Sequence, residues 1–361
     1  MTLVKIGISR VTMNYEKEIK EFVDGLKELK NKYCIPGLSV AIAHENKIIC
    51  STGFGFADIE NKVKATPTTP YRIASLTKPI ASTIILQLVE KGQIDLDKSI
   101  AEYIPNYIEF CEKNKKNLEK PVDFAGKKID LSHLIKNYRY ENQNITIRHH
   151  LQQTIDGEPG ETYRNNGLLF GLLGIAVDFN FKEKFKGLLQ REIIDNLRMN
   201  DSLPCQEDTS KPEVFERLAK PYVLDKNNEL VLSDYPQKGG SSAAGIVSTV
   251  LDLMKFDSAL NSNELISEES KEVAFTNPKT KNGVELPYAL GWFVQKDPNN
   301  AKIIWHYGHW DNSFSSLYIK LPEKALTLII LANSDGLSKN FNLHEGNLYK
   351  SPFAKAFLTN F

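Results

Sequence analysis

Residues 71–79 read Tyr71-Arg72-Ile73-Ala74-Ser75-Leu76-Thr77-Lys78-Pro79 and open an apolar run. No second S-x-x-K occurs in the chain. In a helix that begins here, Ser75 and Lys78 lie on one face, about one turn apart. Ser75 then sits at the positive end of the helix dipole, and Lys78 is close enough to take its proton. Because a hydroxyl needs a nearby base to become a good nucleophile, the stretch indicates a serine acyl-transfer enzyme.

The same four residues have a purely structural interpretation. A serine that precedes a helix often only caps it, and a lysine in the first turn is usually solvated. The stretch continues as a long helix to Gly92, whose glycine suits a helix end, and Pro79 falls near the first turn, where proline is tolerated. Partner residues elsewhere in the chain must therefore decide between the two interpretations.

The segments on either side of this helix predict the fold class. Helical spacing of apolar residues predicts a helix over 15–33, and short apolar runs predict strands at both ends of the chain. The predicted strands are 38–43, 47–51, 290–295, 302–307, 314–321 and 326–333, with further helices at 167–178, 185–197 and 349–358. We therefore expect an α+β fold (an α/β sandwich). An antiparallel sheet built from both chain ends is flanked by helices and carries an inserted, mainly helical lobe.

Length and charge limit the alternatives. We interpret the 361 residues as one catalytic domain, with 1–70 and 236–361 forming a sheet lobe and 71–235 a helical lobe. Lysine plus arginine and aspartate plus glutamate both total 45. The basic excess that marks nucleic-acid binding is therefore missing. No apolar run reaches transmembrane length.

The four cysteines and the first residues bear on the compartment. Cys34, Cys50, Cys111 and Cys205 lack metal-binding spacing, and we expect buried thiols in a reducing compartment, with pairing as the alternative. The first ten residues hold too short an apolar core for a secretion signal. The chain as written is thus predicted to be cytoplasmic, or periplasmic or secreted if a leader has been removed.

Two further segments carry candidate partners. Tyr163-Arg164-Asn165 precedes an apolar helix, and a second Y-x-N, Tyr140-Glu141-Asn142, lies in the polar region 111–145. Trp305-His306-Tyr307-Gly308-His309-Trp310 closes a predicted strand. Singly, each is explained as well by packing: a tyrosine beside a capping asparagine, or an aromatic strand end with a satisfied core histidine.

Taken together and in order, the three segments resemble serine hydrolases of the penicillin-binding-protein and class C β-lactamase superfamily, in its esterase and D-aminopeptidase branch. Further similar segments are 35–41, 53–58, 71–97, 145–149, 240–260, 291–292 and 306–316. The resemblance implies a β-lactamase/transpeptidase-like fold and no metal or organic cofactor. It also implies a small-molecule ester, peptide or β-lactam-like substrate, and it leaves the oligomeric state open.

The resemblance also implies roles for named residues. Ser75 forms the acyl-enzyme, and its hydroxyl is expected within hydrogen-bond reach of Lys78 or Tyr163. Tyr163 acts as general base and then protonates the leaving group, with Lys78 as the cation that makes its phenolate accessible; which of the two acts first stays open. Asn165 orients Lys78 and the substrate.

The third segment supplies the remaining substrate contacts. His306 and Gly308 lie on the strand that faces the substrate, and the backbone N–H groups of Ser75 and His309 form the oxyanion hole.

Two departures from the family pattern bear on specificity. The family segment His-Thr-Ser-Gly is here Gln153-Thr154-Ile155-Asp156, so the loop before Tyr163 is expected to differ. The β-lactamase Lys-Thr-Gly is here His306-Tyr307-Gly308. Unlike lysine, a histidine carries charge only below about pH 6.5. The change favours carboxylic esters or D-amino-acid peptides over β-lactams. β-Lactamase or DD-peptidase activity is the first alternative, and a catalytically silent binding or assembly scaffold is the second.

Overall fold

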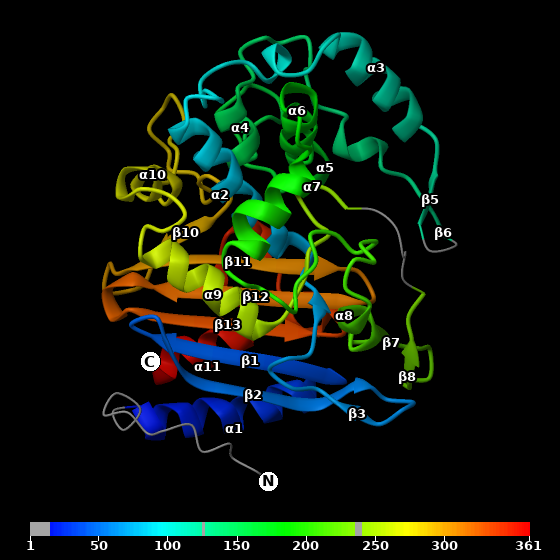
Figure 1. The fold of residues 1–361 in the computed structure, drawn as a ribbon, viewed down its shortest axis with the longest axis vertical. Coiled ribbons are helices and arrows are strands. Elements are labelled where there is room, and N and C mark those ends of the chain that lie inside the picture. The colour runs from blue at the N-terminus through cyan, green and yellow to red at the C-terminus, as the bar shows by residue number, and fades with distance from the viewer. Residues whose placement is uncertain (1–14, 125–126, 235–239) are drawn as a thin grey trace.

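The computed structural model describes residues 15–124, 127–234 and 240–361. Its centre is a seven-stranded sheet in the order β10-β11-β12-β13-β1-β2-β3, and the long strand pairs are antiparallel. The strands are β1 (Gly37–His44), β2 (Lys47–Asp58), β3 (Val63–Lys64), β10 (Phe293–Lys296), β11 (Lys302–Trp310), β12 (Phe314–Leu321) and β13 (Leu326–Ala332). Figure 1 shows the blue N-terminal strands beside the orange C-terminal strands. The predicted sheet from both chain ends is confirmed.

Alternating side chains of the sheet enter two separate cores. In β1, Leu38, Val40 and Ile42 pack with helices α1 (Glu16–Lys32) and α11 (Pro352–Asn360). Ala41 and Ala43 point to the opposite face, toward α2 (Thr77–Glu90) and α9 (Val250–Asn261). This alternation follows from the two-residue period of a strand. The sheet is therefore covered by helices on both faces, as Figure 1 shows.

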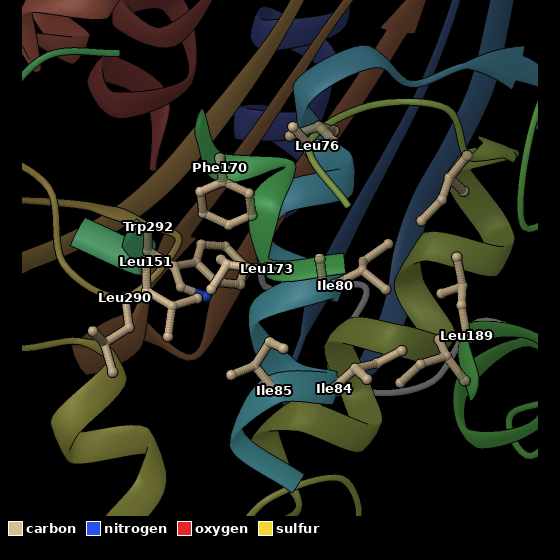
Figure 2. Close-up of a cluster of buried hydrophobic side chains, with 14 of the residues drawn as sticks. Leu76, Ile80, Ile84, Ile85, Leu151, Phe170, Leu173, Leu189, Leu290 and Trp292 are labelled. Atoms are coloured by element: carbon tan, nitrogen blue, oxygen red, sulfur yellow. The ribbon is translucent and has the colours of Figure 1, made fainter. Parts of the chain in front are cut away.

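Helix α2 is buried on nearly all sides. Figure 2 shows Ile80, Ile84 and Ile85 of α2 within a cluster that includes Phe170 and Trp292. Residues 77–88 of α2 are all buried, polar ones included, so this helix is fixed by packing rather than by its own propensity. The segment that carries the S-x-x-K is thus held rigidly between the sheet and the helical region.

Shorter elements complete the chain. The helices are α3 (Tyr107–Leu118), α4 (Ile147–Gln152), α5 (Gly167–Phe170), α6 (Leu172–Asn180), α7 (Phe185–Leu188), a π-helical stretch (Leu189–Asp195), α8 (Pro212–Glu216) and α10 (Glu268–Ala274). The two-stranded pairs are β4 (Tyr71–Arg72) with β9 (Val247–Ser248), β5 (Val122–Phe124) with β6 (Lys127–Ile129), and β7 (Tyr222–Leu224) with β8 (Leu230–Leu232).

Several predicted boundaries shift. The predicted helix over 167–178 is two helices that divide at Gly171. The predicted strand at 290 starts at Phe293 instead, because Gly291 has a φ of +83° and turns the chain. The proposed division into two lobes stays a prediction.

The described chain also tests the cysteine and membrane predictions. All four cysteines are free thiols, but Cys34 is exposed rather than buried as predicted. The first ten residues, which bear on a secretion signal, lie outside the described ranges. Among the described helices, none combines the length and apolarity that a membrane crossing requires.

Candidate active site

Ser75 lies in a tight turn just before α2. It is the middle residue of a short 3₁₀ helix, η2 (Ala74–Leu76), and α2 starts only at Thr77. Ala74 has a φ of +50°, which a residue with a side chain adopts at a cost of about 1–2 kcal/mol. The Thr77 hydroxyl donates to the Ala74 carbonyl at 2.8 Å and holds this turn. Ser75 does not cap either helix, because the cap positions of η2 and α2 are occupied by Ile73 and Leu76 and no side-chain capping bond is formed.

Strand β11 packs against this turn at Gly308, where the two backbones approach closely. The Ser316 hydroxyl on β12 donates to the Ile73 carbonyl at 2.8 Å and joins the sheet to the segment before Ser75. A Cβ at Gly308 would lie 2.4 Å from that carbonyl oxygen and 2.1 Å from the Ser316 hydroxyl. Only a glycine lets β11 approach the serine turn so closely.

Lys78 is a buried amine with neutral partners. Its side chain is 1% exposed, and its Nζ donates to the Asn165 Oδ1 at 2.8 Å and to the Gln153 Oε1 at 3.2 Å. Burial lowers the pKa of Lys78 from 10.5 to about 7, because desolvation disfavours the charged form. At neutral pH a large share of Lys78 is thus a neutral amine that can accept a proton.

Tyr163 lies in an aromatic cluster. Its ring stacks on Tyr288 with centroids 5.3 Å apart and meets the Phe293 ring edge-on. Its hydroxyl is buried and has no hydrogen-bond partner among the described residues. Burial raises the pKa of Tyr163 well above 10, and the neighbouring Tyr288 and Tyr307 raise it further. The phenol is therefore neutral at pH 7, which favours Lys78 over Tyr163 as the first base, a choice that the sequence left open.

The expected hydrogen bond of Ser75 is not formed. In the described part of the chain, the bonds of the Lys78 ammonium go to Asn165 and Gln153, and the Tyr163 hydroxyl is unpaired. Two carboxamide oxygens thus compete with the serine for the lysine. The other candidate tyrosine, Tyr140, packs near Tyr138 and Lys115 instead.

His306 is fully enclosed on β11. Its Nδ1 lies 2.7 Å from the Tyr307 carbonyl oxygen, which only accepts, so Nδ1 carries the hydrogen and Nε2 accepts from the Tyr288 hydroxyl at 2.9 Å. Burial, and then the charge of Lys78, hold the pKa of His306 well below 6.5. The expectation that His306 is charged below about pH 6.5 applied to an unshifted pKa. Burial lowers that pKa here, so the ring stays neutral at mildly acidic pH.

Of the remaining predicted residues, Asn165 lies in the same network as Lys78, whereas the His309 side chain lies outside it. The Asn165 amide donates to the Tyr307 hydroxyl at 3.2 Å while its oxygen accepts from Lys78. The His309 ring bonds Asp311 at 2.7 Å and Ser338 at 2.9 Å, at the outer end of β11. The structure thus brings Lys78, Asn165 and Tyr307 into one network, and places the His309 side chain outside it.

Three residues of this network were not predicted from the sequence as site residues: Tyr307, which bonds Asn165, Gln153 and Tyr288. Gln153 contacts Lys78 directly, and Tyr288 joins Tyr163 to His306. In the sequence, Gln153 stood out because it replaces the histidine of the family segment His-Thr-Ser-Gly. No motif in the sequence pointed to Tyr288.

Two surface hollows of the described chain lie away from this site. They measure about 620 and 580 Å³ and lie between α1 and β2 and beside residues 97–102. Neither is lined by Ser75 or Lys78. Within the described ranges, no three His, Cys, Asp or Glu side chains come together as a metal site.

A buried lysine three residues after a serine, on a helix packed against an antiparallel sheet, defines the class of penicillin-binding-protein and β-lactamase-type serine hydrolases. Comparison with known proteins agrees: the Beta-lactamase family model matches residues 16–348, so the chain belongs to the Beta-lactamase family.

Individual relatives are distant. Protein flp of Staphylococcus aureus (strain MW2) is 25% identical over 337 residues; the match covers 90% of this chain, which spans 64% of the length of that relative. An octameric penicillin-binding protein homologue from Pyrococcus abyssi superimposes with a TM-score of 0.69 at 20% identity, over 94% of this chain and 77% of the other. A class C β-lactamase from Rhodobacter sphaeroides gives 0.65 at 15% identity, over 94% and 97%. These likenesses establish the fold.

Proposed function

We propose that this protein is a serine hydrolase that acts through an acyl-enzyme on Ser75. The observation that carries the proposal is the state of Lys78: a buried amine with two neutral carboxamide partners, one helical turn from the serine. An amine whose pKa is about 7 matches what a general base needs near neutral pH. A lysine that served only solubility would lie in water.

The proposed reaction follows from these groups. The neutral Lys78 amine takes the proton of the Ser75 hydroxyl as the oxygen attacks the substrate carbonyl carbon. The carbonyl electrons move to the oxygen, which the backbone N–H groups of Ser75 and His309 stabilise; one such donor typically contributes about 3 kcal/mol. The C–O or C–N bond then breaks, and the leaving group receives the proton from Lys78. Water hydrolyses the acyl-enzyme by the same steps.

Tyr163 takes a different part from the one expected from the sequence. Burial and two tyrosine neighbours keep its hydroxyl protonated, so it serves as a donor rather than as the first base. An unpaired buried hydroxyl typically costs about 1–3 kcal/mol. A site that retains one has a hydroxyl free to donate a hydrogen bond to the leaving atom, which takes its proton from Lys78. Asn165 holds Lys78 through its 2.8 Å bond.

We further propose a carboxylic ester or a D-amino-acid amide as the substrate class. Recognition of a β-lactam carboxylate benefits from a cation on β11. His306 is neutral, since its pKa lies well below 6.5, and the His309 ring is engaged by the Asp311 carboxylate. The strand therefore supports a substrate that lacks an anionic group at this position.

The decisive experiment is active-site labelling followed by mass spectrometry. The protein and its Ser75→Ala variant are treated with a fluorophosphonate, and the adduct is mapped. A stoichiometric adduct on Ser75 that is absent from the variant supports the hydrolase. No adduct supports a silent scaffold. Turnover of p-nitrophenyl esters, D-amino-acid amides and a chromogenic cephalosporin then separates the substrate classes, and equal turnover of the cephalosporin would show β-lactamase activity.

A further inference from the structure

Gln153 occupies a strained position at the end of α4. It is completely buried, and its backbone has a φ of +53°. Residues other than glycine rarely adopt this left-handed conformation without a local reason. The first turn of α4 is capped by Thr146, whose hydroxyl accepts from the His149 N–H. The strained turn thus directs a single glutamine side chain from the helix end into the site.

The same glutamine joins both sides of the Tyr163–Asn165 segment. Its backbone carbonyl accepts from the Arg164 N–H at 3.0 Å, and its side-chain Oε1 accepts from the Asn166 N–H at 2.8 Å. Asn165 therefore lies between two residues that are each bonded to Gln153. Displacing the glutamine would displace the carboxamide that holds Lys78.

The side-chain oxygen of Gln153 also bonds Lys78, at 3.2 Å. The Lys78 amine and the Asn166 N–H both donate to this oxygen, so they determine the orientation of the Gln153 side-chain amide. The amide nitrogen is buried and, among the residues the structure describes, makes no hydrogen bond of standard geometry; it interacts with the Tyr288 phenol. The amide cannot be reversed without losing both bonds, so its orientation is set by the site.

The groups around Lys78 carry no negative charge. It contacts the carboxamides of Gln153 and Asn165 and the Phe170 ring, whose centroid is 5.6 Å away. Across the described ranges, no carboxylate pairs with it. His306 on β11 interacts electrostatically with Lys78, and its ring is neutral because its pKa is lowered. The phenols of Tyr163, Tyr288 and Tyr307 are also neutral, because their pKa values are raised. The neutral amide of Gln153 therefore occupies a place where a carboxylate would stabilise the ammonium.

We propose that Gln153 is a positioning residue for the base: its neutral carboxamide ties Lys78 to the Asn165 segment and withholds a negative counter-charge, which keeps the amine ready to accept a proton. This inference rests on the proposed function and specifies how the same site is tuned. It predicts that the charge at position 153, and not merely its packing, sets the pH range of the enzyme.

The test is the titration of Lys78 itself. Lysine labelled with ¹³C at Cε is titrated by NMR between pH 5.5 and 10.5, and Lys78→Met identifies the resonance. In Gln153→Glu the midpoint should rise by about one to three pH units, the usual effect of an opposite charge at this distance. In Gln153→Met it should fall, since a bond to the charged form is lost. The control is Gln295→Glu, whose oxygen likewise accepts a backbone N–H, from Leu348 at 2.9 Å; it should leave the midpoint unchanged.

A second measurement connects the titration to chemistry. The pH dependence of fluorophosphonate labelling should move upward in Gln153→Glu by the same amount as the Lys78 midpoint. An unchanged midpoint in both Gln153 variants overturns the inference, whatever their melting temperatures. If the midpoint moves but Ser75 is not labelled in any variant, the hydrolase proposal fails while the control of Lys78 by Gln153 stands.

Discussion

The contact between β11 and the serine turn predicts that Gly308→Ala will disable the site. The new Cβ would lie 2.1 Å from the Ser316 hydroxyl, 2.4 Å from the Ile73 carbonyl oxygen and 3.2 Å from the Ala74 Cβ. Rotation of Ser316 relieves the first contact only by breaking its 2.8 Å bond to Ile73. The second contact involves backbone and requires a displacement of about 1 Å to reach an ordinary separation of 3.4 Å.

That displacement would move the backbone next to Ser75, the proposed nucleophile. The Ile73 carbonyl also accepts from the Leu76 N–H at 3.2 Å, so moving it moves the turn around Ser75. A misplacement of about 1 Å in a catalytic group can reduce the rate about 100-fold, and overpacking a core costs about 1–3 kcal/mol of stability. We therefore expect roughly a hundredfold lower kcat/KM with a modest fall in melting temperature.

The assay is kcat/KM for a p-nitrophenyl ester, together with the fluorophosphonate labelling rate and thermal unfolding. Gly25→Ala is the matched control, because a Cβ at Gly25 in α1 would meet no atom within 4 Å; it should keep full activity and gain about 0.5–1 kcal/mol of stability. The reasoning is refuted if Gly308→Ala retains activity within threefold of the unmodified protein at an unchanged melting temperature.

Three further predictions follow from the same geometry. Ser75→Ala should lose up to about 10⁶-fold in ester turnover while unfolding at the same temperature; activity above a few per cent would point to another nucleophile. The pH profile of kcat/KM should rise through about pH 7, the pKa of Lys78, because only the neutral amine accepts a proton; below that pH it should fall tenfold per pH unit, and a flat profile from pH 5.5 to 8.5 would contradict Lys78 as the base. Asn333→Ala should destabilise the fold by at least about 2 kcal/mol, since this buried amide accepts from the Gly37 N–H at 2.7 Å and donates to the Lys220 carbonyl at 2.9 Å; urea unfolding beside the exposed Asn299→Ala measures the difference, and equal stabilities would contradict it.

Local patterns in the sequence were sufficient for much of the fold. The amphipathic run over 15–33 became α1 (Glu16–Lys32), and the apolar run over 314–321 became β12 with the same limits. Both depend on periodicity, which neighbouring residues determine. The single S-x-x-K also placed Ser75 and Lys78 near each other, because only two residues separate them in the chain; the structure then showed that Ser75 lies in a 3₁₀ turn rather than in the helix itself.

The chemical state of the site depended on contacts that no local pattern contains. His306 was predicted to carry charge at mildly acidic pH, yet burial and the charge of Lys78 keep it neutral. The sequence left open whether Lys78 or Tyr163 is the first base. Burial among Tyr288 and Tyr307, which come from segments more than a hundred residues away, favours the neutral phenol of Tyr163. Gln153 became a partner of Lys78 through a left-handed turn that joins α4 to the Tyr163 segment. The amino-acid sequence by itself thus determined most of the elements and the residue types of the candidate site. Only the tertiary structure decided their protonation and partners, because desolvation and charge depend on every group packed nearby.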